Sequence, residues 1–208
     1  MTSVSALDLR EACFLCESFH PWTYEESDSF VAMLGLGPIG EGYSLIAARE
    51  HVASMLDLDQ DMAAELMEFT ERVRARLRPH YGECVVTEHG RIAPCLSAYA
   101  RAFEPHCLHA HRLVFPGHDR VGLGQLYPGF GATPHESFFD AHRFCEYEGQ
   151  YLYAEDADGS CEIVAVRGPV PRQFFRRLIA ARIGAQERVS WEAFPSLDVV
   201  EAARVRLQ

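Results

Sequence analysis

Residues 109–116 read His-Ala-His-Arg-Leu-Val-Phe-Pro, and the rest of the chain is best interpreted outward from this stretch. Its apolar and β-branched residues, closed by a proline, predict a strand over residues 108–115. On a strand, residues i and i+2 point to the same face, so His109 and His111 would lie side by side. One imidazole can then hold a metal while its neighbour faces a substrate.

Several other segments are predicted around this strand. Residues 84–87 read Cys-Val-Val-Thr, a buried strand, and residues 43–47 form another strand after the glycine-rich turn at 35–42. A further strand is expected within residues 22–34. The strongest helix spans residues 58–77, with Asp59 or Asp61 as its cap and Pro79 just beyond its end. Its apolar residues recur at helical spacing: Met62, Leu66, Phe69, Val73 and Leu77.

The last third of the chain is interpreted as an extension packed on the same domain. Residues 151–154 and 162–166 predict two strands, and Asp156-Ala157-Asp158-Gly159 between them is typical of a hairpin turn. Helices are expected over residues 171–183 and 197–207. We therefore predict an α+β fold: a mostly antiparallel sheet with one long packed helix over residues 1–116, and a C-terminal α/β extension over residues 117–208.

Composition narrows the class of protein. The chain has 208 residues, of which 48% are hydrophobic and 24% charged, as in soluble globular proteins. Its net charge of -11 argues against coating a nucleic acid, which requires a basic face. No apolar run is long enough to span a membrane, and the N-terminus lacks the pattern of a signal peptide. The seven cysteines are therefore interpreted as thiols or metal ligands in a reducing cytoplasm.

Two groups of arginines invite a functional interpretation. Residues 72, 74, 76 and 78 are all arginine near the end of the long predicted helix, and we interpret them as a solvated helix end, where positive charge is favourable. Arg172, Arg176 and Arg177 lie on a later predicted helix. They could bind phosphates or occupy an exposed helix face.

Cys13 and Cys16 have the spacing of a metal-binding knuckle. Taken alone, a pair of cysteines separated by two residues could equally be redox-active. Zinc prefers four cysteine and histidine ligands, so two histidines elsewhere in the chain would be needed to complete a site.

The chain resembles the histidine-triad superfamily of nucleotide hydrolases and transferases. Residues 42–51, which read Gly-Tyr-Ser-Leu-Ile-Ala-Ala-Arg-Glu-His, and then Ser54 and Asp57-Leu58, match the pattern of that family. Glu88-His89-Gly90 matches the segment before its signature, and residues 109–116 match the signature H-x-H-x-H-x-x-P except at Leu113. The resemblance covers roughly residues 13–116. It extends to the zinc-containing branch, which includes hexose-1-phosphate nucleotidylyltransferases.

This resemblance implies a set of roles. A structural zinc ion would be held by Cys13, Cys16, His51 and His109. His111 would attack the α-phosphorus of a nucleotide and form a nucleotidyl-imidazole intermediate, which water or an acceptor then resolves. We further expect Phe30, Glu88, Gly90 and His106 to contact the substrate. Glu88 could instead support a strand. A homodimer is an option that rests on the family alone.

Leu113 departs from the signature. The third histidine of the triad contacts the phosphate and the leaving group, whereas leucine has neither donor nor acceptor. Either another residue serves the leaving group, or the chemistry is different or lost. The candidates for that residue are His106, Arg112, His118, His135 and His142. Strand alternation predicts that Arg112 points away from His111.

Three functions remain open at this point. The first is hydrolysis or nucleotidyl transfer through His111, between which the sequence does not decide. The second is a zinc-stabilised nucleotide-binding module without turnover, which Leu113 favours. The third is a thiol-redox protein that uses Cys13 and Cys16.

Overall fold

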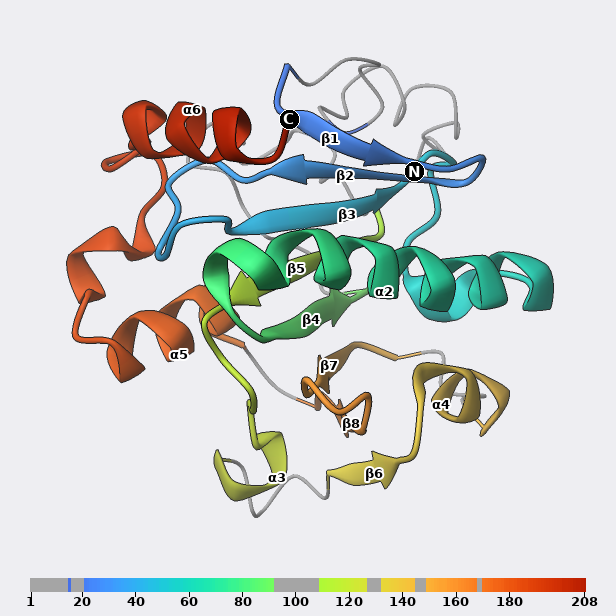
Figure 1. The fold of residues 1–208 in the computed structure, drawn as a ribbon. Coiled ribbons are helices and arrows are strands. Elements are labelled where there is room, and N and C mark those ends of the chain that lie inside the picture. Colours follow the sequence, from blue (N-terminus) through green and yellow to red (C-terminus); the bar gives the residue numbers. More distant parts are fainter. Residues whose placement is uncertain (1–14, 16–20, 92–108, 127–131, 145–148, 168–169) are drawn as a thin grey trace, which may run out of the picture.

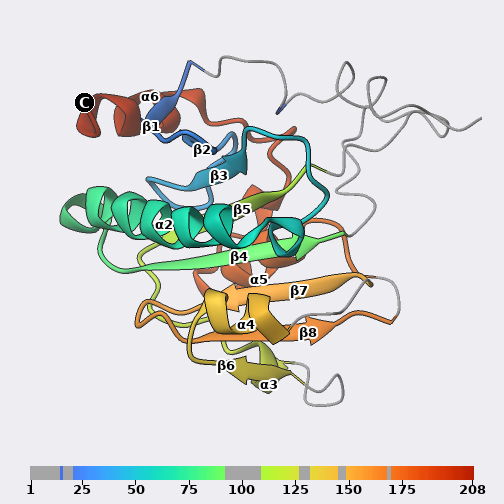
Figure 2. The same cartoon turned by 90° about the vertical axis from the view of Figure 1, so that its right-hand side faces the viewer.

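One eight-stranded sheet forms the centre of the molecule (Figures 1 and 2). The computed structural model describes residue 15 and residues 21–91, 109–126, 132–144, 149–167 and 170–208. The strand order is β1-β2-β3-β5-β4-β7-β8-β6, and every strand pairing in it is antiparallel. The predicted α+β class is confirmed.

All strands except β6 lie largely within predicted strand segments, and β6 was not predicted. The strand bounds are β1 Thr23–Glu26, β2 Phe30–Leu34, β3 Ser44–Ala48, β4 Cys84–Gly90, β5 His111–Pro116, β6 Thr133–His135, β7 Tyr151–Glu155 and β8 Cys161–Ala165. The single strand expected within residues 22–34 is instead a hairpin of β1 and β2. Its turn is held by Glu65, whose carboxylate accepts hydrogen bonds from the hydroxyls of Ser27 (2.5 Å) and Ser29 (2.6 Å).

The long helix α2, Gln60–Tyr81, covers one face of the sheet (Figure 1). Asp59 caps it, as its side chain accepts a hydrogen bond from the Met62 amide at 2.8 Å. The helix continues past the predicted end and includes Pro79, so the expectation that Pro79 lies beyond it is wrong. It ends instead at Gly82, whose φ of 82° is readily adopted only by glycine.

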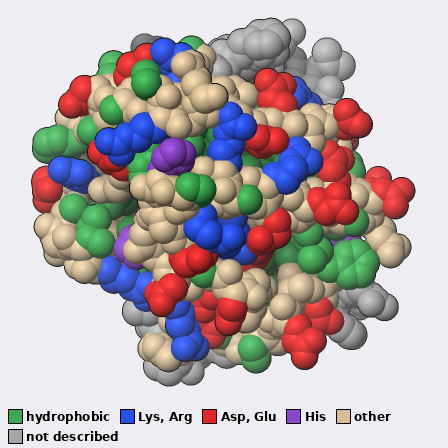
Figure 3. All heavy atoms as spheres, viewed as in Figure 1, with side chains coloured by type: hydrophobic (Ala, Val, Ile, Leu, Met, Phe, Trp, Pro, Cys, Tyr) green, Lys and Arg blue, Asp and Glu red, His purple; other side chains and the backbone are tan. Residues whose placement is uncertain are grey.

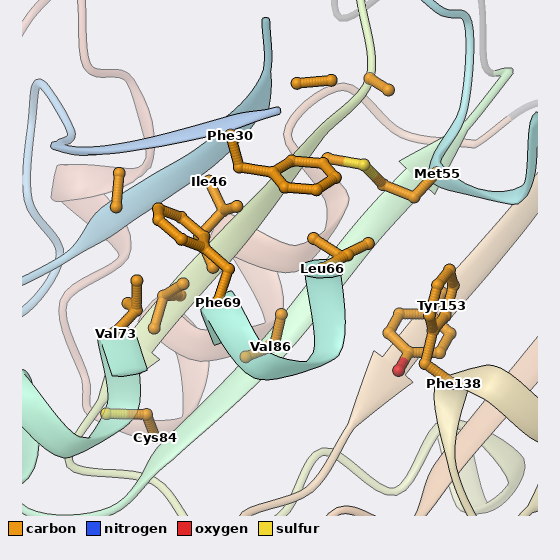
Figure 4. Close-up of a cluster of buried hydrophobic side chains, with 14 of the residues drawn as sticks. Phe30, Ile46, Met55, Leu66, Phe69, Val73, Cys84, Val86, Phe138 and Tyr153 are labelled. Carbon is orange, nitrogen blue, oxygen red and sulfur yellow. The ribbon is translucent and has the colours of Figure 1, made fainter. Parts of the chain in front are cut away.

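The main hydrophobic core lies between α2 and the face of the sheet that it covers, which we call the α2 face. Leu66, Phe69, Val73 and Leu77 of α2 are fully buried against strand residues such as Ile46. Figure 4 shows Ile46 of the sheet next to the ring of Phe69 and the ring of Phe30 beside Met55, with Val73 and Cys84 at one end of the cluster. Cys84 and Cys161 are buried free thiols. The α2 face is therefore filled by the core.

The opposite face of the sheet carries a second core, in which α5, Phe174–Arg182, takes part. Val85 of β4 and Phe115 of β5 project from this face and pack with Phe175. Arg176 does not bind phosphate from an exposed helix face: it is 4% exposed, and its guanidinium donates to the carbonyls of Gly37, Arg188 and Val189.

The remaining helices are short or peripheral. They are η1 Met55–Asp57, α3 Leu123–Leu126, α4 Phe138–Phe144, η2 Gln186–Val189 and α6 Leu197–Arg206. Helix α6 packs beside β2, where Val200 and Ala203 join the main core. None of the described helices is both long enough and apolar enough to cross a lipid bilayer.

A buried ionic network on the α2 face joins α2 to the sheet. Arg74, expected at a solvated helix end, is 1% exposed and forms an ion pair with Glu155 of β7 at 2.8 Å. Glu155 also lies 3.6 Å from Arg112 of β5. At the surface, by contrast, acidic and basic side chains alternate on the side seen in Figure 3.

The C-terminal third adds strands to the same sheet. β7 pairs directly with β4, from Val86 opposite Glu155 to Gly90 opposite Tyr151. The hairpin predicted around residues 156–159 joins β7 to β8. The boundary at residue 116 stays a prediction, and the hydrogen bonding of the sheet runs across it.

Candidate active site

His111 begins β5 and projects from the face of the sheet opposite α2, called here the His111 face. It lies between β3, where Ala47 is its register partner, and β4. Its Nδ1 is 2.9 Å from the carbonyl oxygen of His109, so Nδ1 carries the proton and donates to that oxygen. The lone pair on the ring is then at Nε2. Burial lowers the pKa of His111 despite the opposing effect of this hydrogen bond, so a neutral imidazole is favoured.

His51 and His109 are the two predicted metal ligands that the structure describes. Their ring centroids are 5.0 Å apart and the rings are nearly perpendicular. Two imidazoles bound to one tetrahedral zinc, with Zn–N bonds of about 2 Å, have centroids about 5 Å apart. Nε2 of His109 lies 2.6 Å from the carbonyl oxygen of Ala48. A metal-bound histidine typically donates its other N–H to such an oxygen.

The other predicted ligands, Cys13 and Cys16, lie outside the described residues, as does His106. Leu15, between the two cysteines, is buried against Met33 and Ala47. Ala47 is the register partner of His111, so Leu15 lies on the His111 face. Within the described ranges, no group of three or more His, Cys, Asp or Glu side chains is placed to hold a metal ion.

Leu113 occupies the third signature position on the same face as His111. It is partly buried beside the second core, and its register partners are Leu45 and Thr87. Arg112 points the other way, as predicted: it is fully buried on the α2 face, with its guanidinium carbon 4.1 Å from the ring centroid of Phe138.

The three described histidines that the sequence offered as replacements for a third triad histidine, His118, His135 and His142, are all remote from His111. His118 comes after the opposite end of β5. His135 lies on β6, the edge strand of the sheet, and His142 on α4 bonds the carbonyl of Leu58 at 2.7 Å. None of the three lies on a strand next to His111.

Glu88 and Phe30, two predicted substrate contacts, lie on the α2 face. Glu88 is 1% exposed, and its carboxylate accepts hydrogen bonds from the Met55 amide (2.9 Å) and the Tyr151 hydroxyl (2.6 Å). Phe30 is fully buried beside Phe69. Their part in substrate binding stays a prediction. Their burial on the α2 face favours a structural role, which for Glu88 is the alternative of supporting a strand.

The chain is similar in sequence to a curated nucleotide-processing enzyme. The adenosine 5′-monophosphoramidase hnt1 of Schizosaccharomyces pombe is 27% identical over 106 residues, which are 51% of this chain and 72% of that protein. The predicted resemblance to the histidine-triad superfamily is confirmed. No protein-family model matches the chain.

Solved histidine-triad structures overlap with a similar share of the chain. A hypothetical histidine triad nucleotide-binding protein from Sulfolobus tokodaii is 20% identical and covers 50% of this chain and 68% of its own, with a TM-score of 0.38. A zinc-bound histidine triad family protein from Mycobacterium smegmatis is 18% identical and covers 54% of this chain and 78% of its own, with a TM-score of 0.40.

Gly90, the last residue of the motif before the histidine-triad signature, is required by close packing. A Cβ at this position would lie 1.9 Å from ring atoms of Tyr151, its register partner on β7. Tyr151 in turn donates to Glu88 and lies 2.7 Å from the Ser54 hydroxyl. The glycine therefore allows the buried tyrosine to sit against β4.

We expect Gly90→Ala to lower the free energy of unfolding by about 1–3 kcal/mol, because the added methyl group must displace the buried Tyr151 ring. Urea denaturation followed by circular dichroism would measure this change. Gly40→Ala is a matched control, since a Cβ there meets no atom within 4 Å. Equal stability of the two variants would contradict the packing argument.

Sequence reasoning missed two polar residues on the His111 face, Thr87 and His89 of β4. Both alternate with Glu88 along the strand, and Thr87 is the register partner of Leu113. Strand alternation over residues 87–89 already predicts that Thr87 and His89 share a face. Which face that is could be decided only from the pairing of β4 with β5, because the register determines which residues stand opposite the histidine-triad signature.

Proposed function

We propose that this protein cleaves or transfers at the α-phosphorus of a nucleotide conjugate, with His111 as the nucleophile. The observation that carries the proposal is the hydrogen bond from His111 Nδ1 to the His109 carbonyl, which fixes the ring and leaves the lone pair at Nε2. A phosphorus atom held in front of Nε2 would be attacked to form a nucleotidyl-imidazole intermediate, and a second displacement would release it.

The choice of substrate rests on the relative and on the chemistry of the two steps. Because hnt1 is an adenosine 5′-monophosphoramidase, a nucleoside 5′-phosphoramidate is the first compound to test. Hydrolysis and transfer share the attack by His111 and differ only in whether water or another acceptor enters second. Reactions run with and without a sugar phosphate would separate the two.

We also propose that Cys13, Cys16, His51 and His109 hold a structural zinc ion. The ring separation of 5.0 Å between His51 and His109 fits two ligands of one tetrahedral ion, and the Ala48 carbonyl acts as the outer partner of His109. Zinc bound to His109 would fix the backbone just before β5. It would thereby also fix the orientation of His111, two residues later.

The purified protein is expected to contain about one zinc ion per chain, and Cys13→Ser should lose the ion and melt at a lower temperature. The physical reason is that binding energy at a structural zinc site is also folding energy. Elemental analysis and thermal melting would measure both. Cys84→Ala is the control, because Cys84 is buried in the main core and should leave the zinc content unchanged. A zinc-free wild type would contradict the site and reopen the thiol-redox interpretation.

A nucleotide-binding module without turnover is the second candidate, and Leu113 is the observation that favours it. A leucine at the third signature position supplies no hydrogen bond to a phosphate. This alternative predicts that a nucleoside monophosphate binds both the wild type and His111→Ala. It also predicts no product from the wild type on dinucleoside polyphosphates, nucleotide sugars or phosphoramidates.

A further inference from the structure

His89 of β4 stands opposite His111 on the neighbouring strand. The pairing of β4 with β5 runs from Cys84 opposite Pro116 to Glu88 opposite Arg112, and one further step in this register brings His89 opposite His111. The two side chains are close enough for His111 to lower the pKa of His89. Directly opposite residues of an antiparallel pair project from the same face, with Cβ atoms about 5 Å apart. The two imidazoles therefore share the His111 face.

The His89 ring is held from the side of α5. Its centroid lies 4.9 Å from that of Phe175 and 6.2 Å from that of Phe174. Burial, and then the neighbouring His111, lower the pKa of His89 to about 3, so the imidazole is neutral. A neutral imidazole keeps one N–H donor.

Nε2 of His89 is enclosed and has no hydrogen-bond partner among the described residues. A buried polar atom without a partner costs free energy, and most such atoms in proteins are satisfied. Thr87, two residues earlier on the same face, also has a buried hydroxyl without a partner in the described part of the chain. Two unpartnered polar groups thus flank His111 and Leu113.

His89 is placed to supply the hydrogen-bond donor that Leu113 lacks. Leu113 is two residues from His111 along β5, and His89 is one strand away from it across the sheet. Among the described histidines, His89 is the one that stands on a strand next to His111 and on its face. Both positions place a side chain next to that of His111 on the His111 face.

We propose that His89 donates a hydrogen bond from Nε2 to a non-bridging oxygen of the α-phosphate, in place of the third triad histidine, once the bound substrate has displaced the side chains that enclose Nε2. This proposal rests on the proposed function of His111. In the attack, the Nε2 lone pair of His111 forms a bond to phosphorus, and the bond from phosphorus to the leaving group breaks. Its electron pair stays on the leaving atom, which takes a proton from water. His89 transfers no proton; it stabilises the charge on the phosphate oxygen.

The test measures kcat and KM on a nucleoside 5′-phosphoramidate for a series of variants. We expect His89→Ala to lower kcat about 100-fold with a smaller change in KM, as for loss of one donor to a transition-state oxyanion. His89→Gln, which retains a side-chain N–H, should recover part of this loss. Leu113→His in the His89→Ala background should also recover activity, because it restores the signature donor.

His89→Phe separates hydrogen bonding from packing. It keeps an aromatic ring against Phe174 and Phe175 but has no nitrogen, so it should melt near the wild-type temperature and be as slow as His89→Ala. Activity of His89→Phe near that of the wild type would overturn the proposal, since the ring alone would then suffice. If His89→Ala does not fold, the Phe and Gln variants decide the question.

The experiments distinguish a wrong role for His89 from a wrong proposed function. An active wild type with equally active His89 variants overturns only the role of His89. A wild type without product on any nucleotide conjugate overturns the proposed function. The His89 contact is then tested by calorimetric titration with a nucleoside monophosphate: a dissociation constant raised about ten-fold in His89→Phe supports the contact, and an unchanged one overturns it.

Discussion

Replacing His111 with alanine is expected to lower kcat/KM on a nucleotide conjugate by about 10⁴-fold or more, because the variant has no nucleophile. Fold and zinc content should be unchanged, since the His111 side chain bonds only the carbonyl of His109 among the described residues and is partly exposed. Initial rates, thermal melting and elemental analysis of the same preparation would measure all three quantities.

His118→Ala is the matched control for this experiment. His118 is also a partly buried histidine with a pKa lowered by burial, but it lies beyond the far end of β5. It should therefore retain the activity of the wild type. Equal loss in the two variants would mean that His111 has no special role, and residual activity in His111→Ala close to the wild type would exclude it as the nucleophile.

The second large effect is on stability. Glu155→Gln is expected to lower the free energy of unfolding by about 3–5 kcal/mol, because it removes the carboxylate shared by two buried guanidinium groups. Arg74 and Arg112 lie 2.8 and 3.6 Å from that carboxylate and are at most 1% exposed. Without it, Arg74 keeps only the exposed Glu71, at 2.8 Å, as an ionic partner among the described residues. Arg112 likewise keeps only Glu88, at 4.0 Å. The buried guanidinium groups are then poorly compensated in a medium where an uncompensated charge is costly.

Urea denaturation at neutral pH would measure this loss. Glu83→Gln is the control, because Glu83 pairs with Arg78 at 3.0 Å where both side chains are about half exposed. An exposed ion pair contributes about 0–1 kcal/mol. If Glu155→Gln were no more destabilising than Glu83→Gln, the buried network would not hold α2 to the sheet.

The longer elements of this fold were predictable because local patterns determine them, whereas the short β6, α3 and α4 were not predicted. The spacing of Leu66, Phe69 and Val73 predicted the helix that buries them, and the turn at residues 156–159 predicted the hairpin of β7 and β8. The end of α2 and the turn between β1 and β2 were mispredicted. The helix end depends on the cap at Gly82, and the turn depends on Glu65, which is remote in the sequence.

The site was predictable where a motif was contiguous. His109 and His111 stand two residues apart, so strand alternation alone places them together. The sequence did not decide whether Arg74, Arg176 and Glu88 are exposed or buried. A charged residue is buried only where the fold brings a hydrogen-bonding or ionic partner to it, and the sequence does not show that partner. His89 was missed for the same kind of reason: its neighbour His111 lies 22 positions later and is brought to it only by the register of β4 with β5.

The pairing of β7 with β4 has a practical consequence for any shortened version of this chain. A fragment ending after residue 116 would keep the whole histidine-triad signature but lose the strand that covers β4. The backbone of residues 86–90 would become an edge with unpaired N–H and C=O groups, a template onto which another copy can add its own strand. The strand β7, which follows the histidine-triad signature in the sequence, thus protects the edge of the strand beside that signature.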